Sequence, residues 1–215
     1  MKKLLATLFV AALALMGTQA YAQLSANVGY LNSSAKNPYG IKTDQPSNYN
    51  GFYAGVTYNI PVIAGLCVAP GVYYSFVGGQ ATKSASVNLP ILGTISQSAT
   101  KTYTEHALNG AINLNYGFDI SRDTRVFLFA GPTFQYGLSS QISVKGEGVI
   151  NDKNTTDLYE NTYNRFNIFL GGGAGFEVAN IQVTVGYDYG LLDMSKDTDV
   201  KTNRSGLKLG VGFLF

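Results

Sequence analysis

The sequence predicts an all-β fold, an eight-stranded antiparallel up-and-down transmembrane β-barrel, and three observations lead to it. Apolar residues recur at every second position in eight segments, the connections between these segments alternate between short and long, and aromatic residues gather at both ends of the apolar faces. Alternation with period two is typical of strands with two different faces. A closed barrel leaves no strand edge unpaired, and a lipid environment requires this.

The first four segments span residues 24–30, 52–60, 66–76 and 108–118. Each places one run of mostly apolar side chains on a single face. In chain order these are Leu24, Ala26, Val28 and Tyr30; Phe52, Ala54, Val56, Tyr58 and Ile60; Leu66, Val68, Pro70, Val72, Tyr74 and Phe76; Leu108, Gly110, Ile112, Leu114, Tyr116 and Phe118.

The last four segments span 126–136, 166–178, 181–189 and 205–215 and repeat the pattern. In chain order the apolar face carries Val126, Leu128, Ala130, Pro132, Phe134 and Tyr136; Phe166, Ile168, Leu170, Gly172, Ala174, Phe176 and Val178; Ile181, Val183, Val185, Tyr187 and Tyr189; Leu207, Leu209, Val211, Phe213 and Phe215.

The connections predict that neighbouring strands run in opposite directions. Three connections are short, at 61–65, 119–124 and 179–180, and four are long and polar, at 32–50, 79–102, 139–164 and 192–203. Short turns at one end and long loops at the other are the layout of bacterial outer-membrane barrels.

The N-terminus predicts export. Lys2 and Lys3 precede an apolar run, and Ala20-Tyr21-Ala22 has the small-x-small pattern of a signal-peptide cleavage site. We therefore expect a signal peptide over residues 1–22 and one barrel domain over 23–215. The apolar run is shorter than the roughly 20 residues that a transmembrane helix needs.

The composition argues against a nucleic-acid-binding protein and against a disulfide-stabilised fold. Only 13% of the 215 residues are charged, and removing residues 1–22 takes away two Lys, which leaves 13 basic and 13 acidic residues. A neutral chain with one His offers no general attraction for nucleic acid. Cys67 is the only cysteine, so no internal disulfide is expected.

The aromatic residues of the apolar faces predict two girdles, one at each membrane interface. Aliphatic residues and Gly lie between them. The loop-end girdle comprises Tyr30, Phe52, Tyr74, Phe76, Phe134, Tyr136, Phe166, Tyr187 and Tyr189, and the turn-end girdle comprises Tyr58, Tyr116, Phe118, Phe176, Phe213 and Phe215. A soluble barrel would have no reason for such belts, so outer-membrane lipid is an expected partner.

The opposite face predicts a polar lumen. Buried charges persist when they are paired and hydrogen-bonded, and Asp188 and Lys208 on adjacent strands are the first expected pair. Eight strands enclose a space that side chains can fill, so a wide aqueous pore is not expected. The predicted polar network comprises Glu105, Asn109, Asn113, Arg165, Glu177, Asp188 and Lys208.

Pro70 and Pro132 conflict with this pattern. Each lacks an N–H inside a predicted strand, and a closed barrel has no free edge on which to place it. We expect local bulges at both positions.

Several short segments of the sequence resemble those of a known family. The signal ending "AYAQ", the Pro-x-x-x-Tyr strands, "GGGAGFEV" and the terminal Phe resemble the small outer-membrane β-barrel proteins of Gram-negative bacteria that are often labelled "porin family" and are common in Bacteroidota. Members are similar to the OmpA and OmpX transmembrane barrels. The resemblance implies that the outer-membrane insertion machinery reads the terminal strand, with Phe213 and Phe215 in the insertion signal.

No catalytic, metal or cofactor site is expected. His106, the only imidazole, points outward by parity, and Leu108 stands where the lipid A deacylase pattern would have Ser. Asp193, Asp197 and Asp199 alternate with Lys residues and resemble a solvated loop more than a calcium site. Cys67 is expected to face the lumen as inert core.

The loops suggest a surface role. Alternation continues in Leu138, Ser140, Ile142 and Val144, and "DLYENTYNRF" at 157–166 is expected to return beside it as a strand. Exposed strand edges can pair with another protein. We expect a monomeric structural or surface-interaction protein without catalysis. The alternatives are a narrow channel or transporter for small or apolar solutes and, less favoured, a lipid-modifying enzyme.

Overall fold

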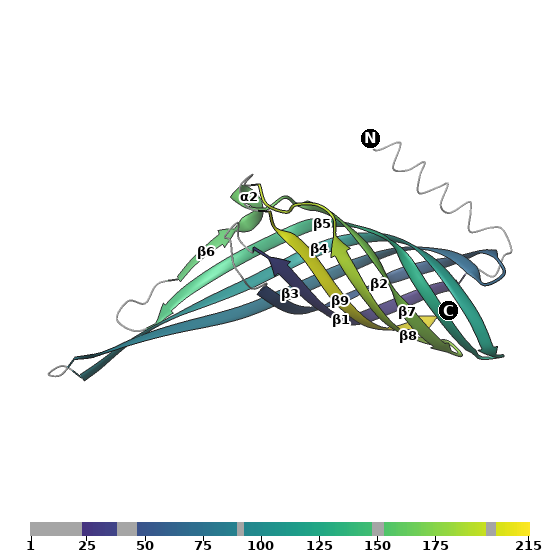
Figure 1. Ribbon diagram of the computed structural model, residues 1–215, viewed down its shortest axis with the longest axis horizontal. Coiled ribbons are helices and arrows are strands. Elements are labelled where there is room, and N and C mark those ends of the chain that lie inside the picture. Colours follow the sequence, from purple (N-terminus) through teal and green to yellow (C-terminus); the bar gives the residue numbers. More distant parts are fainter. Residues whose placement is uncertain (1–22, 38–46, 90–92, 148–152, 197–200) are drawn as a thin grey trace.

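The fold is a closed antiparallel barrel with a sheet that projects beyond one end (Figure 1). The computed structural model describes residues 23–37, 47–89, 93–147, 153–196 and 201–215. The expected signal peptide, residues 1–22, lies outside these ranges. Within the described ranges no helix has the length and apolar character needed to cross a membrane.

The described part contains nine strands and one short helix. They are β1 (Gln23–Lys36), β2 (Ser47–Ile63), β3 (Leu66–Leu89), β4 (Gly93–Ser121), β5 (Thr124–Glu147), β6 (Lys153–Asp157), α2 (Leu158–Asn161), β7 (Phe166–Val178), β8 (Ile181–Gly190) and β9 (Asn203–Leu214).

Eight of the strands form the barrel, and this confirms the predicted fold class. Each pairs antiparallel with its neighbours in chain order, and β1 closes the ring on β9 through pairs such as Val28 with Val211. β6 pairs only with β5, outside the ring. All eight predicted strands are therefore present, with the expected meander.

Two strands are much longer than the sequence pattern predicts. Residues 79–102, predicted to be a loop, continue β3 and β4 as one paired hairpin out to Leu89 and Gly93. This stretch is rich in Ser, Thr, Ala and Gly, so period-two hydrophobicity does not reveal it. β5 continues beside β4 to Glu147, which confirms the extension predicted from the alternation of Leu138, Ile142 and Val144. We call β3 79–89, β4 93–106, β5 139–147 and β6 the projecting sheet.

The return from β5 also differs from the prediction. The returning strand is Lys153–Asp157, not 157–166, and Leu158–Asn161 form α2. The Asp157 side chain accepts a hydrogen bond of 2.9 Å from the Tyr159 N–H and so caps this helix. A local side-chain cap competes with the sheet ladder at this point.

The two strand prolines cause no bulge, so that expectation is wrong. Opposite Pro70 the β2–β3 ladder is interrupted between the pairs Thr57–Gly71 and Ile60–Val68, yet the register is unchanged across the gap. The β4–β5 ladder has the same kind of gap opposite Pro132. A missing N–H is thus accommodated by omitting ladder bonds rather than by inserting a residue. The irregularities of register lie elsewhere, at Pro61/Ile63, His106/Ala107 and Asp119/Ser121.

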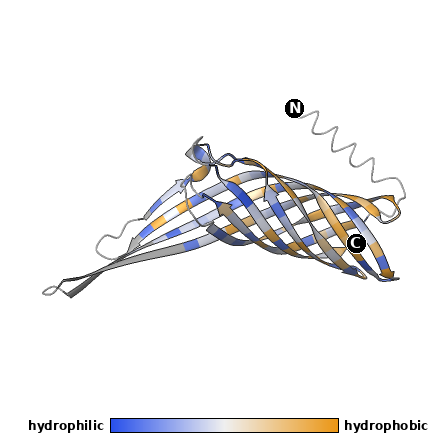
Figure 2. Ribbon diagram, in the orientation of Figure 1, coloured by the Kyte–Doolittle hydropathy of each residue, from blue (hydrophilic) through white to orange (hydrophobic). Residues whose placement is uncertain are grey.

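The barrel wall has an apolar exterior. The outward side chains of every barrel strand are largely exposed aliphatic or aromatic groups, whereas their neighbours along each strand point inward. Figure 2 shows hydrophobic and hydrophilic residues alternating along these strands. Such a surface suits lipid rather than water.

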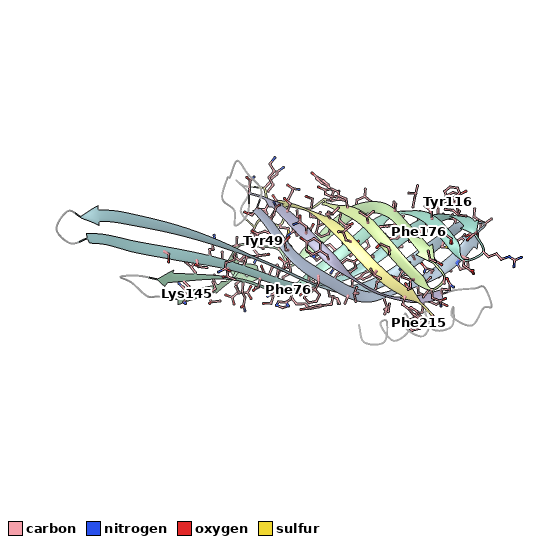
Figure 3. All side chains as sticks on the ribbon, turned by 90° about the horizontal axis from the view of Figure 1, so that it is seen from below. Tyr49, Phe76, Tyr116, Lys145, Phe176 and Phe215 are labelled. Atoms are coloured by element: carbon pink, nitrogen blue, oxygen red, sulfur yellow. The ribbon has the colours of Figure 1, made fainter. Side chains whose placement is uncertain are left out.

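The girdle aromatics lie on this exterior, near the two ends. Tyr30 faces Phe52 across β1–β2, and Tyr136 faces Phe166 across β5–β7. Figure 3 shows Tyr116, Phe176 and Phe215 at the turn end and Lys145 on the projecting sheet beyond the other end. Phe76 and Tyr58 are half-buried, and the remaining predicted girdle residues are exposed. Their contact with membrane interfaces stays a prediction.

Two glycines test how closely the wall is packed. A methyl group at Gly173 would clash with the Val185 carbonyl and lie 2.7 Å from the Gly186 Cα, whereas Gly110 has open space around it. We expect Gly173→Ala to lower the free energy of unfolding by about 1–3 kcal/mol, and Gly110→Ala to change it by about 0.5 kcal/mol or less. Urea unfolding in lipid vesicles measures both. Equal effects would contradict the close approach of β7 and β8.

Candidate functional site

The interior of the barrel is closed near its loop end by a buried ion pair. Arg204 Nη1 lies 2.5 Å from Glu105 Oε1, and the side chains are 5% and 2% exposed. Tyr103 donates its hydroxyl hydrogen to Glu105, and Arg204 Nη2 lies 3.0 Å from the same hydroxyl. A charged pair at this depth is stable because each member satisfies the other.

Glu105 is among the predicted lumen residues, whereas Arg204 is not. Arg204 falls between the predicted loop 192–203 and the predicted start of the last strand. β9 in fact begins at Asn203, and Arg204 has the same parity as Lys208. Extending the lumen-facing periodicity back from Lys208 would have found it.

Above the ion pair an apolar cluster fills the loop end, and we call it the plug. Tyr49 and Tyr103 stack with ring centroids 4.5 Å apart, and Met194 is only 2% exposed. The plug joins strand residues to residues of the long connections: Leu31, Ala35, Tyr49, Val77, Tyr103, Leu158, Tyr159, Tyr163 and Met194.

Polar contacts hold the plug in place. Lys196 Nζ donates to the carbonyls of Tyr159 and Glu160, each at 2.8 Å. The Asp193 carboxylate accepts from the backbone N–H groups of Ser195 and Thr202 at 2.9 and 2.8 Å. Asp193 therefore orders this loop, while Asp197 and Asp199 lie outside the described residues.

Arg165 lies beside the plug at the loop end. The sequence predicts it in the polar network of the lumen instead. Its Nη1 donates to the carbonyl of Leu138 at 3.0 Å, and its guanidinium lies over the Tyr159 ring at 5.0 Å. Burial raises the pKa of the Tyr159 phenol, so this hydroxyl stays protonated at neutral pH.

Below the ion pair the lumen holds a polar layer. The expected ion pair of Lys208 with Asp188 is present. Asn109 donates to Ser75 at 2.8 Å and accepts from Gln135 at 3.1 Å. Buried polar groups are stable when they are bonded in this way.

Two cavities that share wall residues lie in the lumen of the described barrel. The central one, about 140 Å³, lies beneath Glu105 and Arg204 and includes Asn113 in its wall. We call the second, about 270 Å³, the turn-end cavity. Its wall comprises Gln23, Asn59, Pro61, Cys67, Asn115, Arg125, Phe127, Glu177, Gln182 and Leu214.

The seven residues predicted as a lumen network are therefore spread over three levels. Glu105 and Arg165 lie near the plug, Asn109, Asn113, Asp188 and Lys208 line the central cavity, and Glu177 lines the turn-end cavity. Cys67 faces the lumen as expected.

His106 lies on the exterior at the level of the loop-end girdle. Tyr74 Oη is 2.5 Å from its Nδ1, and its ring packs 5.0 Å from that of Phe76. Glu105, its neighbour in sequence, points into the lumen. The imidazole therefore has an aromatic environment on the outer face of the barrel. In the described segments no three His, Cys, Asp or Glu side chains cluster as metal ligands would.

The projecting sheet presents two strand edges beyond the barrel. β2 pairs with β3 only as far as Asn50–Gly78, so residues 79–89 of β3 pair on one side with β4 alone. β6 pairs with β5 alone. Within the described part of the chain, these edges carry backbone groups without a neighbouring strand.

The comparisons with known proteins agree with this architecture. The family model described as "Outer membrane protein beta-barrel domain" matches residues 16–196. A search of the curated proteins finds no match.

The solved structures that match this chain share little sequence with it. Ail of Yersinia pestis, in complex with the heparin analogue sucrose octasulfate, is 17% identical, with 91% of this chain and 100% of that chain covered and a TM-score of 0.45. Neisserial surface protein A is 15% identical, with the same coverage and a TM-score of 0.49. The outer membrane enzyme PagL is 16% identical, with 89% and 98% covered and a TM-score of 0.37.

Two basic residues of the lumen differ in burial and should differ in effect. Arg204→Ala would leave Glu105 as an uncompensated buried charge, so we expect it to lower the free energy of unfolding by about 3–5 kcal/mol. Lys208→Ala should cost about 1–2 kcal/mol, because the Lys208 side chain is 31% exposed and solvent screens the pair. Urea unfolding in vesicles measures both. A smaller loss for Arg204→Ala than for Lys208→Ala would contradict the assignment.

Proposed function

The chain belongs to the outer membrane protein β-barrel domain family and resides in the Gram-negative outer membrane, and from that premise we propose that it acts at the cell surface. The projecting sheet would be the part that contacts an external protein partner, and the barrel would be its membrane anchor. The loop end would face the exterior, as in barrels with long external loops.

The free edges of the projecting sheet carry this proposal. Residues 79–89 of β3 and residues 153–157 of β6 each pair on one side only among the described residues. Exposed edges are templates for strand addition, in which main-chain hydrogen bonds supply affinity. The geometry suits a partner segment that is extended rather than helical.

Transport through the lumen is the alternative, and the plug weighs against it. A solute would have to pass Tyr49, Tyr103 and Met194 and then the Glu105–Arg204 pair. Breaking a buried ion pair is costly, so a conduit for small or apolar solutes is disfavoured.

Catalysis is also disfavoured. Acyl chemistry needs a nucleophile and a base held together. His106 is hydrogen-bonded to Tyr74 on the exterior, and Glu105 is paired with Arg204.

We also propose that the protein is a monomer and that Phe213 and Phe215 serve as its signal for insertion into the outer membrane.

Shortening the projecting sheet tests the surface role. Replacing residues 82–100 by an Asn-Gly turn removes the β3 edge, and replacing residues 144–154 in the same way removes the β6 edge. Both replacements keep all residues of the plug, whereas a deletion of residues 140–162 would remove Leu158 and Tyr159 from it. We expect one or both variants to lose at least about tenfold in binding of nanodisc-embedded protein to immobilised serum proteins, because edge pairing supplies the affinity.

Heat-modifiable gel migration is the control for barrel folding in both shortened variants. The proposal requires a folded barrel together with lost binding. Full binding by both folded variants, or no binding by the intact protein, would contradict it.

A further inference from the structure

We infer that the turn-end cavity is a binding site for a small zwitterion that carries one carboxylate and one ammonium group. The cavity measures about 270 Å³, which is sufficient for a molecule of amino-acid size. It lies at the opposite end of the lumen from the plug, so this inference is independent of the proposed surface role.

Arg125 is held in the cavity wall by its surroundings. Its Nη2 donates to the Gly65 carbonyl at 3.1 Å. Its guanidinium lies against Gly117, where an added methyl group would approach Nη2 to 2.5 Å. The bare backbone of Gly117 therefore makes room for the guanidinium. The cation is positioned by the fold rather than free in solvent.

The hydrogen-bonding capacity of Arg125 is not used up. Its Nε is buried and has no hydrogen-bond partner in the described structure. The nearest carboxylate is Asp119 at 3.8 Å, which is too long for a hydrogen bond, and the Asp119 side chain is 81% exposed. An N–H with this much unmet capacity favours an acceptor that arrives from the cavity.

The same wall presents the opposite charge beside Arg125. Glu177 is the direct cross-strand neighbour of Arg125, yet among the described residues it forms neither an ion pair nor a hydrogen bond. Asn115, which also lines the cavity, has a buried Oδ1 without a partner. Two acceptors without partners therefore line the cavity together with an unused donor.

A zwitterion matches both charges that line this cavity. Its carboxylate can accept from Arg125, and its ammonium group can donate to Glu177 and Asn115. Unpaired buried polar groups are costly, so a ligand that satisfies all three gains affinity and orientation. An ion of one sign would satisfy one of the two charged side chains and leave the other unpaired.

Cys67 provides a built-in reporter of occupancy. It is the only cysteine in the chain, it is partly exposed, and its Sγ lies 4.0 Å from Arg125 Nη2. The rate of iodoacetamide labelling of the mature protein in detergent, followed by mass spectrometry, is measured with glycine, β-alanine or γ-aminobutyrate. Acetate and methylammonium serve as single-charge controls at equal ionic strength.

We expect at least one of the three amino acids to slow labelling about threefold when present at about twice its Kd, because about one third of the sites then stay free. The distance between the carboxylate and the ammonium group in the amino acid that protects Cys67 best indicates the spacing between Arg125 and Glu177. Acetate and methylammonium should have little effect. Arg125→Gln and Glu177→Gln should each abolish the protection, while Arg122→Gln, on the exposed turn, should retain it.

Equal protection by the single-charge ions would overturn the inference, as would an absence of protection by all three amino acids. Protection that persists in both Arg125→Gln and Glu177→Gln would also overturn it. If one variant fails to migrate as a folded barrel, the other alone decides, because each removes one half of the site.

Discussion

The structure depends on one constraint: inside a bilayer every backbone N–H and C=O must find a partner within the protein. A meander of eight strands meets this requirement only if its first and last strands pair, and β1 and β9 do so over twelve residues of register, from Ser25–Leu214 to Lys36–Asn203. Ring closure also fixes which face each side chain takes. A shift of register by one residue would turn the whole apolar face of a strand inward.

The closed ring determines what the interior can be. Eight strands leave a narrow lumen, and the charges near its loop end and centre are paired. The Glu105–Arg204 pair is almost fully buried, and Lys208–Asp188 is less so. Beyond the ion pair, α2 and the neighbouring loops add apolar residues to the strand ends and complete the plug. The loop end is therefore closed at two levels, by the Glu105–Arg204 ion pair and by the apolar plug. The turn end keeps a cavity with polar residues in its wall.

Much of the barrel could be predicted from sequence because lipid and lumen impose opposite demands on alternate residues. Val183, Val185 and Tyr187 on β8 show this rule in a single strand. The β3–β4 part of the projecting sheet escaped prediction because its Ser- and Thr-rich strands, such as 79–89, show no hydrophobic period, whereas the extension of β5 was predicted from Leu138, Ile142 and Val144. The plug escaped for a different reason: Met194 lies in a loop and Tyr159 in the short helix α2, and only tertiary contacts bring them to Tyr49. Local side-chain capping, as at Asp157, likewise overrode a strand that alternation had suggested.

The central claim is that the lumen is closed at its loop end, so that the barrel anchors a surface sheet rather than conducts solutes. Single-channel recording in planar bilayers tests this most directly. The account predicts at most rare, small openings for the intact protein, and more frequent openings when Glu105 and Arg204 are replaced together by Ala. A stable conductance through the intact barrel would contradict it.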